Sequence, residues 1–135
     1  MNNDLSIYIH YPFCQAKCPY CDFNSHVKHG VNQERFLQGY LREIEYFAKY
    51  VKNRNIKTIF FGGGTPSLMK SFMVEKIIDH LAEFWAIDDL VEITLEANPS
   101  SFEAEKFVDF KKAGINRLSL GIQALNDDDL RFKGT

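Results

Sequence analysis

Apolar and polar side chains change their spacing several times along the chain, and each change predicts a new element. Residues 5–10 alternate between apolar and polar side chains, which is the period of a half-buried strand. From Gln33 to about Lys52 the apolar residues recur at helical spacing, and Asn32 can cap that helix. The stripe consists of Phe36, Leu37, Tyr40, Leu41, Ile44, Ala48 and Val51.

The same alternation of strand and helix continues to the end of the chain. Further strands are predicted at 57–61, 91–96 and 116–121, and further helices begin at Ser71, Ser100 and Asn126-Asp127. The third helix starts with a capping box, Ser100 and Glu103, and should end just before Gly114. Strands that alternate with helices favour a parallel sheet with right-handed crossovers.

The expected fold class is therefore α/β, built from parallel βα units. Four strands and three complete helices make either a small open sheet or the first half of a barrel. The helix that begins at Asn126-Asp127 is cut within its first turns, which favours the barrel.

Composition excludes several classes of function. The chain has 135 residues, which fits one domain, and its net charge of −2 gives no indication of nucleic-acid binding. No apolar run approaches the roughly 20 residues that a transmembrane helix needs. Residues 1–4 lack the basic segment of a secretory signal, so a cytoplasmic location is expected.

The three cysteines are the strongest chemical feature. Cys14, Cys18 and Cys21 form a C-x3-C-x2-C motif, and an odd, clustered set is a poor disulfide framework. Thiolates are the usual ligands of iron–sulfur clusters, and three of them leave one iron of a [4Fe–4S] cube open for a small molecule. A zinc site is the main alternative, and three structural thiols without metal are a further one. Zinc would need a fourth ligand, for which the nearby side chains are His10, Asp22 and His26.

The other unusual residues follow the predicted strands. Ligands of parallel sheets bind beyond the C-terminal ends of the strands. The run Gly62-Gly63-Gly64-Thr65-Pro66-Ser67 follows the second strand, Glu96 ends the third, and Gln123 comes after the fourth. The glycine run does not match a phosphate-binding loop, so its N–H groups are expected to hold an amino-acid carboxylate or ribose hydroxyls. Glu96 is either a ligand contact or a solvated strand-end charge. Tyr8 and His10 on the first strand could be core residues, and for His10 the core interpretation is favoured.

Several of these segments together resemble the radical S-adenosylmethionine (SAM) coproporphyrinogen III oxidase-like family. The matching segments are 8–14, the cysteine motif, 61–67, 96–99 and 119–123, so that the resemblance covers nearly the whole chain. It implies that Cys14, Cys18 and Cys21 ligate a [4Fe–4S] cluster whose open iron binds SAM, and that the reduced cluster cleaves SAM. It also implies SAM contacts at Tyr8, Tyr20, Gly63, Gly64, Thr65, Glu96 and Gln123.

One residue separates two branches of this family. Its porphyrinogen-decarboxylating oxidases carry another cysteine two residues after the third cluster ligand, where this chain has Phe23. The segment around Phe23 is similar to the haem chaperone branch, which binds haem and is implicated in delivering it to respiratory enzymes. The resemblance therefore favours a haem chaperone, with SAM, haem or porphyrin and a respiratory haem protein as partners, over an oxidase of porphyrin biosynthesis. No catalytic side chain is assigned.

The resemblance also predicts what this chain does not contain. The family's SAM domain is an incomplete barrel with more βα units than the four strands expected here. Residues 1–135 are therefore expected to be the N-terminal part of a radical SAM core domain, without the rest of the barrel or the haem-associated C-terminal domain. A truncated, non-functional gene product is a further interpretation. A bare last strand would leave an unpaired edge, so we expect the chain to fold poorly alone.

Overall fold

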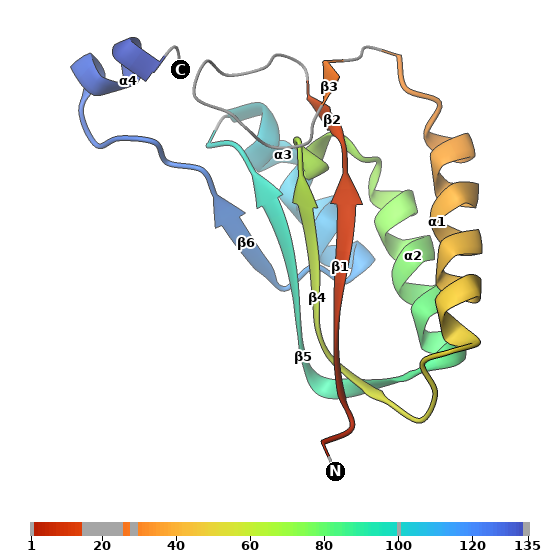
Figure 1. Cartoon of the computed structure of the whole chain (residues 1–135). Helices are drawn as coiled ribbons and strands as arrows, with labels where there is room; N and C mark the ends of the chain where they lie inside the picture. Colours follow the sequence, from red (N-terminus) through yellow and green to blue (C-terminus); the bar gives the residue numbers. More distant parts are fainter. Residues whose placement is uncertain (1, 15–25, 28–29, 100, 134–135) are drawn as a thin grey trace.

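The computed structural model describes residues 2–14, 26–27, 30–99 and 101–133. Its centre is a parallel four-stranded sheet in the order β1-β4-β5-β6 (Figure 1). These strands are β1 (Asp4–Tyr11), β4 (Asn55–Gly63), β5 (Ala86–Ala97) and β6 (Arg117–Leu120). A short parallel pair, β2 (Phe13–Cys14) with β3 (His26–Val27), extends beyond the end of β1. The helices are α1 (Gln33–Ala48), α2 (Ser71–Phe84), α3 (Ser101–Ala113) and α4 (Asp127–Lys133), and Pro66–Leu68 form a 3₁₀ turn.

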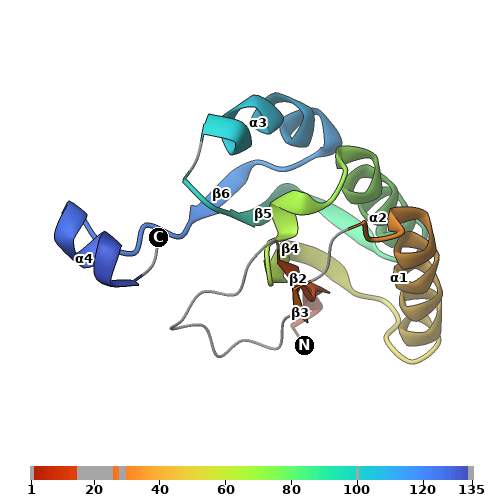
Figure 2. The same cartoon turned by 90° about the horizontal axis from the view of Figure 1, so that it is seen from above.

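Helices cover one side of this sheet. Figures 1 and 2 show α1, α2 and α3 on the convex side of the curved sheet, whereas α4 lies apart at the end of an extended segment. In the described part of the chain no helix covers the concave side. The predicted parallel βα fold is therefore confirmed, and it is open on one side.

The covered face of the sheet is the core. Ile9 lies opposite Phe61 and Phe61 opposite Leu95, so one apolar row runs across three strands. Alternation places every second residue on this face. Its residues include Ile9, Tyr11, Ile59, Phe61, Ile93 and Leu95, all of which are buried. The helices complete the core, most of all α2, whose Met73, Val74 and Ile77 are fully buried.

The opposite face, here called the open face, has different chemistry. The register aligns Tyr8 with Phe60, Phe60 with Thr94 and Thr94 with Arg117 across all four strands. The open face comprises Ser6, Tyr8, His10, Thr58, Phe60, Gly62, Glu92, Thr94, Glu96, Arg117 and Ser119. Polar and aromatic side chains therefore occupy the face that faces inward when such a sheet closes into a barrel.

Several predicted helix ends are confirmed. α1 begins at Gln33, and the Asn32 side chain accepts a hydrogen bond from the Arg35 N–H at 3.0 Å. It ends at Ala48, earlier than the predicted Lys52, because the next N–H groups change to a tighter turn: Lys49 donates to the Tyr46 carbonyl oxygen and Tyr50 to that of Phe47. α3 ends at Ala113 before Gly114, whose φ is 120°. The predicted cap at Ser100 lies outside the described residues.

Two other features differ from the prediction or add to it. β5 begins at Ala86 rather than at residue 91, because Ile87 pairs with Ile56 of β4. The two-residue strands β2 and β3 have no periodic pattern that could have predicted them.

None of the described helices is both long enough and apolar enough to span a bilayer.

Candidate functional site

The candidate site lies where β1, β4 and β5 end. Because the strands are parallel, their C-terminal ends meet at one edge of the sheet, the upper edge in Figure 1. This edge brings together His10 of β1, Gly62 of β4 and Glu96 of β5, with Cys14 just beyond β1. Residues that are far apart in the sequence are therefore neighbours, as the strand-end argument predicted.

Cys14 packs directly on the glycine run. Its side chain is 8% exposed, and a Cβ added to Gly64 would lie 2.9 Å from the Cys14 Sγ and 2.5 Å from the Phe13 carbonyl oxygen. Two backbone hydrogen bonds hold the segments together: the Gly64 N–H donates to Tyr11 at 2.6 Å and the Thr65 N–H to Phe13 at 2.8 Å. Any side chain at Gly64 would therefore displace the start of the cysteine segment.

These contacts change the role expected of the glycines. The N–H groups of Gly63, Gly64 and Thr65 all donate within the chain, to Glu96, Tyr11 and Phe13. They are therefore not the exposed donors that the sequence suggested, and a ligand would meet this loop at other atoms. Gly63 has a φ of 114°, a backbone conformation that favours glycine.

Gly62, which the sequence analysis did not single out, makes room for the side chains around it. A Cβ added there would lie 2.9 Å from the Tyr8 ring, 2.8 Å from the Phe60 ring and 3.2 Å from the Glu96 Oε2. The absence of a side chain at Gly62 thus lets Tyr8 and Glu96 approach one another over the end of β4. The only signal for this role was its place as the first residue of the glycine run.

Glu96 sits in a partly desolvated position. Its Oε2 accepts a hydrogen bond from the Gly63 N–H at 3.2 Å. Burial raises the pKa of the Glu96 carboxyl, although the Gly63 hydrogen bond and nearby His10 act in the opposite direction. A partly desolvated carboxylate is stabilised by hydrogen bonds, and an ammonium group or ribose hydroxyls can donate them.

Tyr8 and His10 adjoin this carboxylate. The Tyr8 hydroxyl and the His10 Nδ1 are 3.0 Å apart, and burial together with Glu96 raises the pKa of Tyr8. The interpretation of Tyr8 as a core residue is wrong, since its side chain is 57% exposed on the open face. His10 is only half-buried, and strand alternation puts it on the same face as Tyr8, so the favoured core interpretation of His10 is wrong as well.

Hydrogen bonds from side chains of α1 hold the end of β1 and the turn after β4 in place from the convex side of the sheet. The Gln33 Nε2 lies 3.3 Å from both the Tyr11 hydroxyl and the Leu68 carbonyl oxygen, and the Gln33 Oε1 accepts from the Lys70 N–H. The Tyr40 hydroxyl donates to the His10 carbonyl oxygen at 2.6 Å. The first turns of α1 thus fix both the end of β1 and the turn after β4. Helical periodicity predicted Tyr40 as a core residue but gave no signal for the role of Gln33.

The remaining predicted residues divide into two groups. Gln123 follows β6 at the same edge, where its Nε2 donates to the Gly121 carbonyl oxygen at 3.0 Å. Cys18, Cys21 and Tyr20, and the alternative zinc ligand Asp22, lie outside the described residues. Within the described residues no group of three or more His, Cys, Asp or Glu side chains could hold a metal ion.

Three comparisons with known proteins describe what the chain resembles. The family model "Radical SAM superfamily" matches residues 8–134. The heme chaperone HemW of Escherichia coli is 43% identical over 131 residues, which covers 96% of this chain and 35% of that protein. The mitochondrial radical S-adenosyl methionine domain-containing protein 1 of Danio rerio is 36% identical and is matched over 97% of this chain and 30% of its own length.

A solved structure shows the same likeness in three dimensions. The coproporphyrinogen III oxidase of Escherichia coli, a radical SAM enzyme, superposes with a TM-score of 0.85 at 28% identity, over 98% of this chain and 31% of that one. The chain thus spans about a third of the length of the relatives it matches.

Proposed function

The chain belongs to the radical SAM superfamily, and from this premise we propose that it is the cluster- and SAM-binding part of a haem chaperone. The superfamily implies a [4Fe–4S] cluster and SAM. The similarity to heme chaperone HemW over 96% of the chain supports the haem function. The observation that carries the proposal is the packing of the buried Cys14 thiol on Gly64, at the edge where Glu96 also lies.

The described residues fit this pair of cofactors. Cys14 offers one thiolate, and we propose that Cys18 and Cys21 offer the other two. Glu96 would accept hydrogen bonds from the amino group or the ribose of SAM, while Tyr8, Gly63, Gly64, Thr65 and Gln123 shape the surrounding surface. Tyr20 would lie beside the adenosine. When bound, the reduced cluster supplies the electron that SAM cleavage requires.

The protein's own contribution is to hold these groups in a fixed geometry. Gly64 lets the Cys14 thiol lie against the turn after β4, and Gln33 braces that turn against β1. Glu96 is positioned by the Gly63 N–H before any ligand arrives. Such prior positioning lowers the entropy loss on binding. We propose that residues 1–135 form part of a radical SAM core domain that acts in the cytoplasm.

Coproporphyrinogen III oxidation is the second candidate, because the structural match is to an enzyme with that activity. Phe23 disfavours it, since the oxidase branch has a cysteine at that position. Sequence identity also favours the chaperone, since it is 43% with HemW and 28% with the oxidase. In this proposal haem is carried rather than made, and a respiratory haem protein receives it.

A two-stage experiment tests these alternatives. The chain is reconstituted anaerobically with iron and sulfide, and bound iron, sulfide and zinc are measured beside Cys14→Ser. We expect iron and sulfide in the wild type, with a clear loss in the variant, whereas retained zinc without iron would favour the zinc site. The reconstituted chain is then given SAM, a reductant and coproporphyrinogen III. We expect no decarboxylated product, and its formation would favour the oxidase.

A further inference from the structure

The turn Pro66–Leu68, which follows the glycine run, is held by side chains from two helices. The Gln33 Nε2 of α1 lies 3.3 Å from the Leu68 carbonyl oxygen. The Lys106 ammonium of α3 donates to the preceding carbonyl oxygen, that of Ser67, at 3.1 Å. α1 and α3 stand on opposite sides of α2 (Figures 1 and 2), so the turn is held from both ends of the helical layer.

We propose that Lys106 is a positioning residue for Cys14, the cysteine that packs beside this turn. The inference rests on the proposed function only in naming Cys14 as a ligand of the cluster. Lys106 acts through the backbone of the turn and not on the cluster or on SAM. Its ammonium group fixes the Ser67 carbonyl, and the turn in turn fixes the start of the cysteine segment.

The path from Lys106 to Cys14 consists of short contacts. Thr65, the residue before the turn, donates its N–H to the Phe13 carbonyl oxygen at 2.8 Å. Phe13 precedes Cys14, whose Sγ would lie 2.9 Å from a Cβ added to Gly64. A shift of the turn must therefore move the Phe13 carbonyl group and open the packing around the thiol.

The chemistry of the Lys106 contact makes it a strong one. Ser67 is fully buried, so its carbonyl oxygen has no access to water, and a charged donor forms a stronger hydrogen bond than a neutral one. Lys106 is half-buried, and its side chain lines a small hollow together with Leu68 and Phe110. Long side chains of this kind bury an apolar stem while the charged end reaches a polar group. Removal of the ammonium group would deprive a buried carbonyl of this donor.

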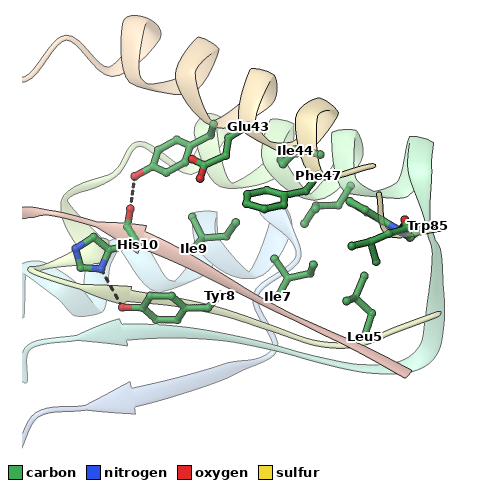
Figure 3. Close-up of a pocket in the computed structure, with 12 residues that line it drawn as sticks. Leu5, Ile7, Tyr8, Ile9, His10, Glu43, Ile44, Phe47 and Trp85 are labelled. Atoms are coloured by element: carbon green, nitrogen blue, oxygen red, sulfur yellow. Dashed lines mark hydrogen bonds between the residues drawn. The ribbon is translucent and has the colours of Figure 1, made fainter. Parts of the chain in front are cut away.

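The side chains of α1 act on other parts of the same site. The Tyr40 hydroxyl donates to the His10 carbonyl oxygen at 2.6 Å, which fixes the end of β1 (Figure 3). Gln33 contacts the Leu68 carbonyl oxygen and the Lys70 N–H, where the turn leads into α2. Lys106 therefore adds a support on the side of the turn toward α3.

The reactivity of the Cys14 thiol measures this role in the chain without a cluster. Cys14 is 8% exposed, so a reagent reaches it mainly when its packing on Gly64 opens. Cys18 and Cys21 are replaced by serine in every sample, which leaves one of the three thiols. Alkylation by iodoacetamide is then followed by mass spectrometry. We expect Lys106→Met to raise the alkylation rate roughly tenfold, the effect of losing one hydrogen bond to a charged group.

Three further variants separate positioning from a general loss of stability. Lys106→Arg keeps a cationic donor and should react at close to the wild-type rate. Lys112→Met makes the same change at an exposed lysine of the same helix and should leave the rate unchanged. Thr94→Val lowers the free energy of unfolding from the open face. It should also leave the rate unchanged, because local opening of the turn does not break the contact between Thr94 and Arg117.

Two results would overturn the proposal. One is a Lys106→Met chain that reacts no faster than the wild type, and the other is a Thr94→Val chain that reacts as fast as Lys106→Met. Far-ultraviolet circular dichroism checks that each variant is folded. If Lys106→Met does not fold, the milder Lys106→Gln is measured in its place, with the same expected and contrary results.

Cluster retention provides the second readout. In the chain with all three cysteines, reconstituted with iron and sulfide, Lys106→Met should lose iron to a chelator several-fold faster than the wild type, whereas Lys106→Arg should not. Equal rates of iron loss in the wild type and Lys106→Met would overturn the role of Lys106 at the cluster. A wild-type chain that never holds a cluster would instead remove the proposed function, while the alkylation rates would still decide whether Lys106 positions Cys14.

Discussion

The two faces of the sheet carry different kinds of residue for different tasks. On the covered face Phe61 is fully buried among apolar side chains, while on the open face its neighbour Phe60 stacks on Tyr8 with ring centroids 6.1 Å apart. The covered face holds the fold together through apolar burial. The open face and its upper edge keep partly desolvated polar groups, such as Glu96, within reach of a ligand. Along each strand, the side chains on the covered face thus stabilise the fold, while the alternate side chains form the surface where a ligand would bind.

The adjacent phenylalanines offer the largest test of this difference. Phe61→Ala should lower the free energy of unfolding by about 3–5 kcal/mol, because it leaves a cavity in the core. Phe60→Ala should cost about 1–2 kcal/mol, since that ring is only partly buried. Urea unfolding of both variants measures the difference. Equal losses in the free energy of unfolding would mean that the open face is also part of a packed core.

Gly64 tests whether the upper edge depends on close packing. Gly64→Ala places a methyl group 2.5 Å from the Phe13 carbonyl oxygen, so the cysteine segment must shift at a cost of about 1–3 kcal/mol. The chain should then lose most of its reconstituted iron. Gly39→Ala is the control, because nothing lies within 4 Å of a Cβ there and the change favours helix α1. Iron retained equally by the two variants would remove the structural argument for the cluster site.

Glu96 should show opposite effects on binding and on stability. Glu96→Gln keeps an acceptor for the Gly63 N–H but removes the charge, and it should weaken SAM binding by about tenfold or more. Calorimetric titration of SAM into the reconstituted chain measures this loss. Unchanged affinity would show that Glu96 is a solvated strand-end charge, the alternative that the sequence left open.

The pH dependence of stability gives a second readout at Glu96. Burial raises the folded-state pKa of its carboxyl, so the folded chain holds this proton more tightly than the unfolded chain does. The resulting stabilisation is present below the unfolded carboxyl pKa of about 4.3 and is lost as pH rises through the raised folded value. Glu96→Gln should therefore gain stability relative to the wild type as pH rises through that window. Urea unfolding across the window checks the sign, and a constant difference would contradict it.

Thr94 should give the smallest effect. It is 1% exposed on the open face, and its Oγ1 lies 3.3 Å from the Arg117 Nη1. Thr94→Val should cost about 1 kcal/mol in urea unfolding, since a buried hydrogen bond is lost. Thr58→Val, on the same face, should stay within about 0.5 kcal/mol of the wild type. Similar values for both would show that the Thr94 contact contributes little.

The sequence predicted the covered face better than the open one. Alternation in residues 5–10 and the helical stripe of α1 follow from burial, and burial leaves a clear pattern of apolar residues. The convergence of Glu96 with the glycine run also followed, because parallel strands end at one edge. These features depend on periodicity, which a single sequence records directly.

Other features depend on distances that periodicity does not contain. That Gly64 must lack a side chain follows from the Phe13 carbonyl oxygen and the Cys14 thiol, which reach it only in the folded chain. The same holds for Gln33, whose contacts with Tyr11 and Leu68 join three separate segments.

The most direct test of the central claim is an electron paramagnetic resonance spectrum of the anaerobically reconstituted and reduced chain, recorded with and without SAM. The proposal predicts a [4Fe–4S]⁺ signal that changes when SAM is added, because SAM would bind at an open iron beside Glu96. A signal that SAM leaves unchanged would contradict the SAM site at the strand ends. The absence of any cluster signal, with zinc bound instead, would contradict the iron–sulfur assignment itself.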